Sequence, residues 1–85
     1  MLKVISFFQE GCIACEEQDP INREVEAALR IRFETINPLK ERSYIDTYHL
    51  QVTPTIVVIK DGRVVEQFEG VVHREQLEEA IRKHL

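Results

Sequence analysis

The segment VISFFQEGCIAC, Val4 to Cys15, joins a predicted strand to a predicted helix. Its first half, Val4 to Phe8, is an almost unbroken apolar run rich in β-branched and aromatic side chains, which is typical of a strand buried on both faces. The run ends before Gly11, and apolar residues then recur at helical spacing from Cys12 to about Leu29. The segment therefore predicts a strand that leads directly into a long helix.

The rest of the chain predicts three more strands and two more helices. Asp61-Gly62 lies between two β-branched runs, which is the strongest short signal for a hairpin. Asn37-Pro38 is typical of a helix start, with asparagine as the cap and proline in the first turn. We expect strands at residues 31–36, 55–59 and 64–68, a short helix that begins at residues 37–38, and a last helix at residues 74–85.

The predicted order of elements is β-α-β-α-β-β-α, in a single domain that spans residues 1–85. The first crossover implies that the first two strands are parallel, and the hairpin implies an antiparallel pair at the edge of the sheet. We therefore expect an α/β fold with three layers, in which helices cover both faces of a four-stranded mixed sheet.

The composition restricts the class of function. Acidic residues outnumber basic ones by 15 to 11, and this balance gives no concentrated positive surface of the kind that nucleic-acid binding requires. No apolar segment approaches the ~20 residues of a membrane span, and the N-terminal residues resemble a strand without a cleavage site. We therefore expect a cytoplasmic protein, a monomer that binds neither nucleic acid nor membrane.

The pair Cys12-Ile13-Ala14-Cys15 lies where the first strand delivers the chain into the helix. On a helix, residues i and i+3 share one face, so the two sulfur atoms can meet. The first cysteine stands at the helix N-terminus, where free amides and the helix dipole favour a thiolate. In a cytosolic protein, a Cys-x-x-Cys pair after a strand–helix junction indicates redox chemistry.

Two other interpretations of the cysteine pair remain open on the sequence alone. A structural zinc site takes four protein ligands, and the chain has no second cysteine pair. Its three histidines, His49, His73 and His84, lack the spacing that would complete such a site. The pair could also be an inert part of the core.

A second motif, Val52-Thr53-Pro54-Thr55, comes immediately before the third predicted strand. Proline is tolerated at strand ends but not in a strand interior, so we expect an irregular backbone conformation at Pro54. This motif makes the chain resemble the thioredoxin family over essentially its whole length, when it is taken together with three other features. These are the Cys-x-x-Cys pair, Pro20 five residues after the second cysteine, and the glycine before the last helix. The resemblance does not extend to the first strand and helix of full-length thioredoxins. The order of elements is therefore also similar to that of glutaredoxins.

The resemblance implies a three-layer thioredoxin-like sandwich and a role for each residue of the two motifs. Cys12 is expected to be the exposed attacking thiol and Cys15 the resolving thiol, and the two would form a redox-active disulfide. Pro54 is expected to be cis and to lie beside the cysteines, while the backbone of Thr53 pairs with an incoming peptide. Gly70 is expected to let the substrate backbone approach closely.

Several positions depart from the family pattern. Gly11 replaces the tryptophan that usually precedes the first cysteine, and Ile13-Ala14 replaces the usual pair between the cysteines; we expect Gly11 and Ile13 to contact the substrate. Ser6 stands where thioredoxins bury an aspartate that assists the resolving cysteine, so another route, such as water, must take the proton from Cys15. The Gly-Gly-Asp-like element with which glutaredoxins hold glutathione is absent after Phe68.

Three functions follow from the motifs and the resemblance. The first is a general protein disulfide reductase that uses no metal or organic cofactor and is recharged by a thiol-reducing flavoprotein such as thioredoxin reductase. The second is a glutaredoxin-type enzyme that uses glutathione or another small thiol. The third is a thioredoxin-like binding module that docks a partner and uses its cysteines little.

Overall fold

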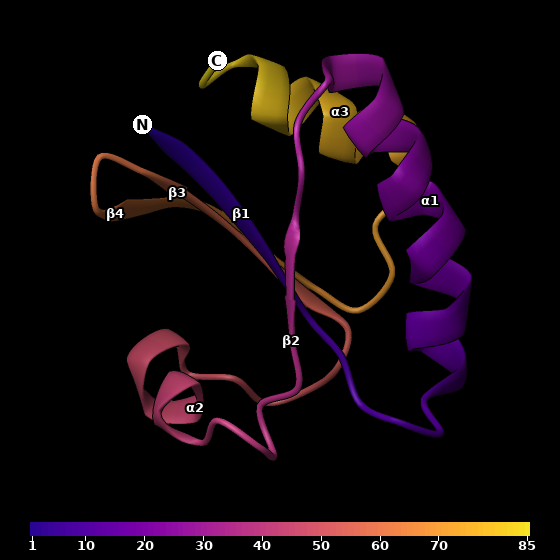
Figure 1. Ribbon diagram of the computed structural model, residues 1–85, viewed down its shortest axis with the longest axis vertical. Coiled ribbons are helices and arrows are strands. Elements are labelled where there is room, and N and C mark those ends of the chain that lie inside the picture. Colours follow the sequence, from indigo (N-terminus) through magenta and orange to yellow (C-terminus); the bar gives the residue numbers. More distant parts are fainter.

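The computed structural model describes residues 1–85 and contains four strands and three helices in the predicted order (Figure 1). The elements are β1 (Leu2–Phe7), α1 (Ile13–Leu29), β2 (Glu34–Ile36), α2 (Ser43–Tyr48), β3 (Thr55–Lys60), β4 (Arg63–Glu69) and α3 (Arg74–Arg82). The α/β class and the order of elements expected from the sequence are both confirmed.

The four strands form one mixed sheet with the order β2-β1-β3-β4. β1 pairs in parallel with β2 and antiparallel with β3, and β3 pairs antiparallel with β4 across the hairpin at Asp61-Gly62. β1 therefore lies inside the sheet. This position explains why its sequence is apolar almost without interruption, because both of its faces are covered.

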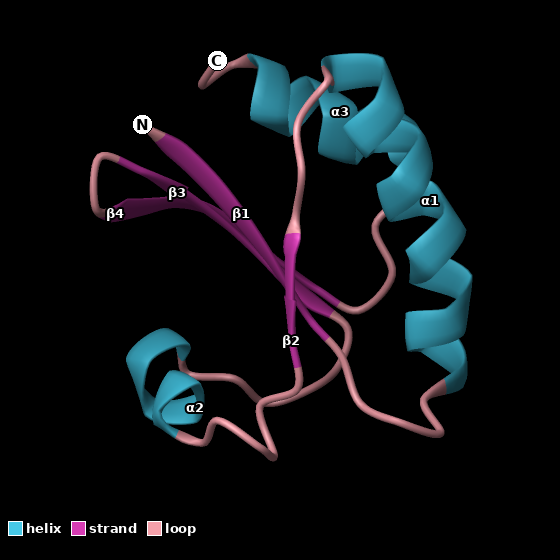
Figure 2. Cartoon of the chain, viewed as in Figure 1, coloured by secondary structure: helices cyan, strands magenta, loops and turns pink.

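The helices lie on both sides of the sheet, α1 and α3 on one face and α2 on the other (Figure 2). Each face has its own apolar cluster, and the side chains of β1 alternate between the two, with Val4 in the first and Ile5 in the second. The cluster under α1 and α3 contains the buried residues Val4, Val25, Ile56, Val58, Val72, Leu77 and Ile81. The cluster under α2 contains Ile5, Phe7, Ile36 and Val57.

The second strand is shorter than the sequence predicts, since it begins at Glu34 and not at Ile31. α1 ends at Arg30 in the left-handed conformation (φ 56°), and the backbone N–H of Ile31 still donates to the carbonyl of Glu26 at 3.1 Å. The N–H of Phe33 donates to the Glu26 side chain at 2.7 Å. Residues 31–33 therefore belong to the hydrogen-bonded end of α1, and β2 begins only after them.

The second helix begins later than predicted, at Ser43 and not at Asn37. Asn37 does act as a cap: its side-chain oxygen accepts a hydrogen bond from the N–H of Leu39 at 3.0 Å, and its carbonyl accepts one from Lys40 at 3.0 Å. These bonds close a turn at residues 38–40 that does not continue as a helix. The last helix also ends earlier than predicted, at Arg82 and not at Leu85. The two residues that follow it, Lys83 and His84, form a turn.

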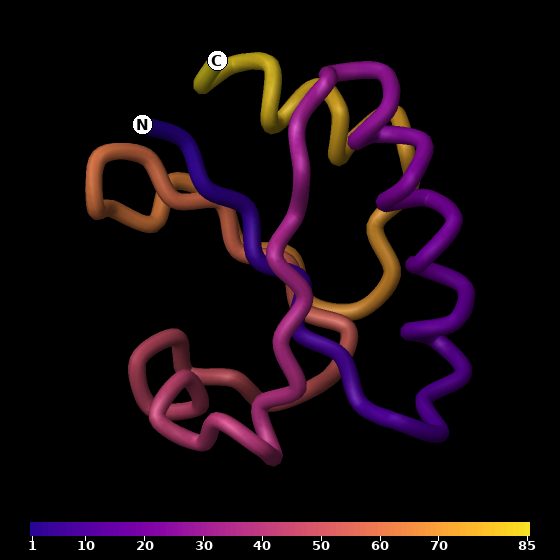
Figure 3. The backbone as a smooth tube through the Cα atoms, viewed as in Figure 1, coloured from indigo at the N-terminus to yellow at the C-terminus, as the bar shows by residue number.

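The two chain termini lie at one end of the molecule, and the loop between β1 and α1 lies at the other (Figure 3). The start of β3 approaches this loop, so the two motifs singled out in the sequence share one end of the fold. No helix of the structure combines the length and the apolar character needed to cross a membrane.

Candidate active site

The two cysteines are joined by a disulfide at the start of α1. Gly11 turns the chain with a φ of +72°, a left-handed conformation that favours glycine, and Cys12 then adopts an extended conformation as the N-cap of the helix. Cys15 lies one turn further, with its Cα atom 5.2 Å from that of Cys12. The backbone N–H of Cys15 donates to the sulfur of Cys12 at 3.1 Å, so the helix N-terminus is directed at this sulfur.

The segment before β3 lies against Cys12 although it is about forty residues away in the chain. The Sγ atom of Cys12 is 3.6 Å from both the carbonyl oxygen and the hydroxyl oxygen of Thr53. The Thr53–Pro54 peptide bond is cis, as the resemblance implies, and Pro54 itself is buried. The structure thus brings together the two motifs that the sequence singled out.

Gly70 completes the group of residues expected at the site. Its N–H donates to the carbonyl of Pro54 at 2.8 Å, and its φ of +80° again favours glycine. The backbone N–H and carbonyl of Thr53, in contrast, take part in no backbone hydrogen bond. Both backbone groups of one residue beside Cys12 therefore lie outside the hydrogen bonding of the sheet.

A hydrogen-bonded network lies below Cys15, where the sequence had suggested only that Ser6 replaces an acid. Asn22 donates to the Ser6 hydroxyl at 3.1 Å and accepts from the Gln18 side chain at 2.9 Å. Gln18 is 1% exposed and also pairs with both backbone groups of Val72, donating to its carbonyl at 3.1 Å and accepting from its N–H at 2.9 Å. The network is neutral and fully satisfied, so it contains no carboxylate that could take a proton.

Gln18 and Asn22 were missed by the sequence analysis. They are buried in α1 together with Val25, at positions i, i+4 and i+7. Two amide side chains on the buried face of an amphipathic helix are unusual, because burial of a polar group is costly unless it is hydrogen-bonded. That pattern is the signal that could have identified them.

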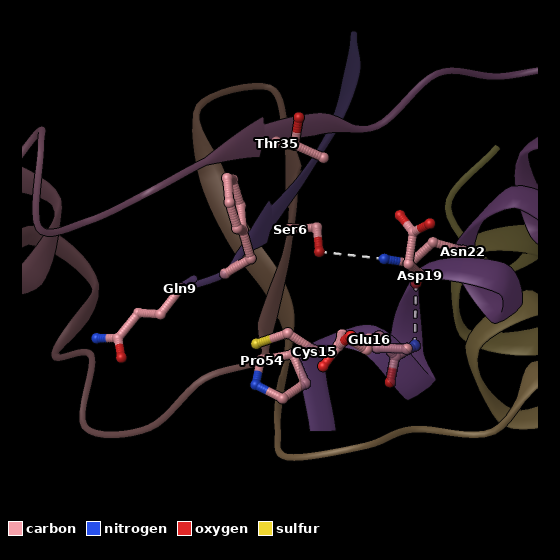
Figure 4. A pocket seen from close by; sticks show the side chains of 10 residues that line it. Ser6, Gln9, Cys15, Glu16, Asp19, Asn22, Thr35 and Pro54 are labelled. Carbon is pink, nitrogen blue, oxygen red and sulfur yellow. Dashed lines mark hydrogen bonds between the residues drawn. The ribbon is translucent and has the colours of Figure 1, made fainter. Parts of the chain in front are cut away.

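A polar cleft of about 390 Å³ opens between this network and the cysteine pair (Figure 4). Cys15 lines the cleft together with Ser6 and Asn22, and Glu16 and Asp19 border it from α1. Most of the residues that line the cleft are polar, and the cleft reaches Cys15.

The carboxyl groups with shifted pKa values lie away from the cysteines. The pKa of Glu66 is lowered first by its hydrogen bond to His84, whose ring nitrogen lies 3.1 Å away, and further by the charge of Lys83. The pKa of Asp61 is lowered by the N-terminal ammonium, and that of Glu78 by Arg82. These groups concern the stability of the fold and not the chemistry of the site.

The zinc interpretation finds no ligand set in the structure. No group of three or more histidine, cysteine, aspartate or glutamate side chains is arranged to hold a metal ion.

Tyr44 and Tyr48 stack on each other and contact the ring of Phe7 with centroid distances of 5.5 and 5.8 Å. Both tyrosines pack against the apolar cluster under α2.

Comparison with known proteins supports this assignment at the level of sequence. The thioredoxin family model matches residues 1–83. A thioredoxin of Chlamydia pneumoniae is 31% identical over 84 residues, which cover 98% of this chain and 82% of that protein. The chloroplastic thioredoxin Y2 of Arabidopsis thaliana is also 31% identical over 84 residues, and these cover 96% of this chain but only 50% of that protein.

Solved thioredoxin structures have the same fold. The thioredoxin of Fasciola hepatica superposes with a TM-score of 0.87 at 27% identity, covering 99% of this chain and 81% of that one. The thioredoxin NaTrxh of Nicotiana alata gives 0.86 at 26% identity, covering 98% and 72%. This chain thus spans about half the length of the plastid proteins it matches and most of the length of the others. These relatives are thioredoxins, and the chain belongs to the thioredoxin family of thiol–disulfide oxidoreductases.

Proposed function

We propose that this protein reduces disulfide bonds in other proteins, with Cys12 and Cys15 alternating between a dithiol and a disulfide. The observation that carries the proposal is the Cys12–Cys15 disulfide at the N-terminus of α1, with the Thr53 backbone 3.6 Å from the Cys12 sulfur. A thiol that is to attack a disulfide needs to be accessible and to be stabilised as a thiolate. Cys12 meets both requirements, because it is only partly buried and accepts the N–H of Cys15.

In the first step, the Cys12 thiolate attacks one sulfur of the substrate disulfide. A bond forms between Cys12 Sγ and that sulfur, the substrate S–S bond breaks, and the other substrate sulfur leaves as a thiolate. The hydroxyl of Thr53 lies 3.6 Å from Cys12 Sγ and, with the N–H of Cys15, stabilises the negative charge before the attack.

In the second step, Cys15 loses its proton and attacks Cys12 Sγ. The Cys12–Cys15 disulfide forms, the mixed disulfide breaks, and the second substrate thiolate leaves, so that two electrons have passed to the substrate. Ser6 cannot act as the base. The proton of Cys15 instead passes to water in the polar cleft, whose lining includes Cys15.

A substrate peptide would bind in extended form across the site. The unpaired backbone groups of Thr53 would form strand-like hydrogen bonds with it. Gly11, Ile13 and Gly70 would border the peptide. Gly11 and Gly70 have no side chain to obstruct it, and Ile13 is 82% exposed beside the attacking sulfur.

The disulfide must be reduced again after each cycle. We propose that a thiol-reducing flavoprotein such as thioredoxin reductase supplies the two electrons, since the site itself contains no residue that could donate them. We also propose that the protein works as a cytoplasmic monomer, in a compartment where thiols are kept reduced. The bacterial thioredoxins among its relatives support this location, although other relatives are named as chloroplastic.

The reduction of insulin by dithiothreitol tests the proposal. Catalytic amounts of the protein should accelerate the reaction, and Cys12→Ser should abolish the acceleration. An inactive wild-type protein that still captures partners would favour the binding module. A rate that depends on glutathione and not on a reductase would favour the glutaredoxin-type enzyme.

A further inference from the structure

Two exposed apolar side chains flank the sulfur of Cys12. Ile13 directly follows this cysteine and is 82% exposed. Val52, which is 49% exposed, precedes Thr53, whose oxygens lie 3.6 Å from the same sulfur. A substrate that brings its disulfide to Cys12 must therefore cover both side chains, and their burial favours apolar substrate residues next to the disulfide.

The Val52 side of the site continues into a small groove. The groove has a volume of about 160 Å³ and begins at Thr53. Leu39, Ile45, Leu50 and Val52 contribute its apolar lining. Gln9 and Gln51 are among the polar residues that line the rest of it. The groove lies beside the backbone that would pair with a bound peptide, so its aliphatic side chains offer contact to one apolar side chain of that peptide.

The opposite side of the site is acidic. Three glutamates border it, which we call the acidic rim: Glu10, Glu16 and Glu17. All three are exposed, Glu10 in the loop before α1 and the other two near the start of this helix. None of the three takes part in an ion pair, whereas six of the chain's other carboxylates do.

The one basic side chain of α1 and the first basic side chain of α3 are already paired with other carboxylates. Arg23, on α1, pairs with Asp19 at 3.0 Å, and Arg74, at the start of α3, pairs with Glu24 at 3.2 Å. The basic residues near the groove, Lys40 and Arg42, are on the other side of the site and have Glu41 between them. Negative charge is therefore concentrated on the α1 side of Cys12.

We propose that this face selects protein disulfides that are flanked by lysine or arginine on the α1 side and by an apolar residue on the Val52 side. The proposal rests on the disulfide reductase function. It follows from charge complementarity, because uncompensated carboxylates around a site raise the local concentration of cationic substrates and speed their association. The rim acts on the association of the substrate, which precedes the electron transfer at Cys12 and Cys15.

The test uses two peptide disulfides that differ only in two residues beside the cysteine, Lys-Lys in one and Glu-Glu in the other. The kcat/KM for each peptide is divided by its rate of reduction by the uncharged reagent dithiothreitol, which removes differences in intrinsic reactivity. At low ionic strength we expect the lysine peptide to be preferred by about tenfold or more. The preference should shrink in 1 M salt, where the screening length falls to about 3 Å.

A charge-reversed pair of variants separates the rim from the net charge of the protein. Glu10→Lys combined with Glu17→Lys should reverse the preference. The ratio of the two normalised rates measures this reversal, because any change in the reactivity of Cys12 affects both peptides alike. Glu75→Lys combined with Glu79→Lys is the matched control, because these exposed residues of α3 form no ion pair and lie far from the cysteines. The control should keep the wild-type preference.

Two results would overturn the proposal, and they are distinguishable. Equal normalised rates for both peptides, or an equal effect of the rim and control variants, would reject the selection of cationic substrates and leave the reductase function intact. Failure of the wild-type protein to reduce either peptide would reject the reductase function itself, and the proposed selectivity with it.

Discussion

The two cysteines differ in their surroundings at the scale of single residues. Cys12 caps α1 and lies beside Thr53 at the surface, whereas Cys15 is one turn deeper and lines the polar cleft. In the proposed mechanism, the two thiols of the motif have separate roles. Cys12 meets an external disulfide, and Cys15 attacks the mixed disulfide that Cys12 then holds.

This difference predicts the behaviour of two single substitutions. Cys15→Ser should leave Cys12 able to attack a substrate and unable to release it, so mixed disulfides should accumulate. Cys12→Ser should form none. Mass spectrometry of each variant after mixing with an oxidised substrate, without reductant, measures the adduct directly. More adduct on Cys12→Ser than on Cys15→Ser would mean that the order of attack is reversed.

At the scale of elements, one side chain links α1 to the loop before α3. Gln18 pairs with both backbone groups of Val72, which is 4% exposed and belongs to the apolar cluster under the two helices. The same loop contains Gly70, which is bonded to Pro54. Through this loop, the buried side chain of Gln18 is linked to the backbone before β3, for which we propose substrate binding.

Gln18→Ala should destabilise the protein by about 2–6 kcal/mol, because two buried backbone groups lose their partners at about 1–3 kcal/mol each. Urea unfolding monitored by circular dichroism gives the change in the free energy of unfolding. Gln76→Ala is the control, since this glutamine is exposed on α3 and should matter little. Similar values for the two variants would show that the Gln18 link contributes no stability.

A second link, between β4 and the C-terminal end of α3, is sensitive to pH. The hydrogen bond to His84 lowers the pKa of Glu66, so the folded state binds a proton at this site less readily than the unfolded state. The resulting stabilisation is present above the ordinary glutamate pKa and is lost as the pH falls through the lowered value. Glu66→Gln should therefore reduce stability at pH 6 by less than about 1 kcal/mol.

The difference between wild type and Glu66→Gln should disappear in strong acid, when Glu66 is protonated in both states. Thermal unfolding of both proteins between pH 2 and pH 7 gives this comparison. A difference that stays constant over the whole range would mean that the contact acts through packing and not through charge.

At the scale of the whole molecule, the core is independent of the cysteines. Neither apolar cluster contains Cys12 or Cys15, and the disulfide closes a loop of only a few residues. Loop entropy then limits its contribution to about 2 kcal/mol. The fold should persist in both redox states, as a protein that cycles between them requires.

Reduction with excess dithiothreitol should therefore lower the free energy of unfolding by no more than about 2 kcal/mol. The variant with both cysteines replaced by serine, measured without reductant, should match the reduced protein. Unfolding of the chain on reduction would contradict this prediction and would make the disulfide a structural one.

Local patterns in the sequence were enough to identify the cysteine pair at a strand–helix junction, the hairpin at Asp61-Gly62 and the order of elements. These features depend on neighbouring residues, whose spacing and turn chemistry act at short range. The predicted starts of β2 and α2 were wrong, because local hydrogen bonds compete with the strand and the helix at these positions. The Glu26 side chain accepts the N–H of Phe33 at the end of α1, and the Asn37 side chain accepts the N–H of Leu39 in a turn. Propensity alone does not show which of the competing structures forms.

Only the tertiary structure shows which distant residues meet around the sulfur atoms. Thr53 comes to Cys12 across 41 positions, and Gln18 comes to Val72 across 54. The groove and the acidic rim also arise from segments that the sheet order brings to one end of the molecule. Contacts of this kind depend on how two helices and a loop pack on the sheet, which no local pattern encodes.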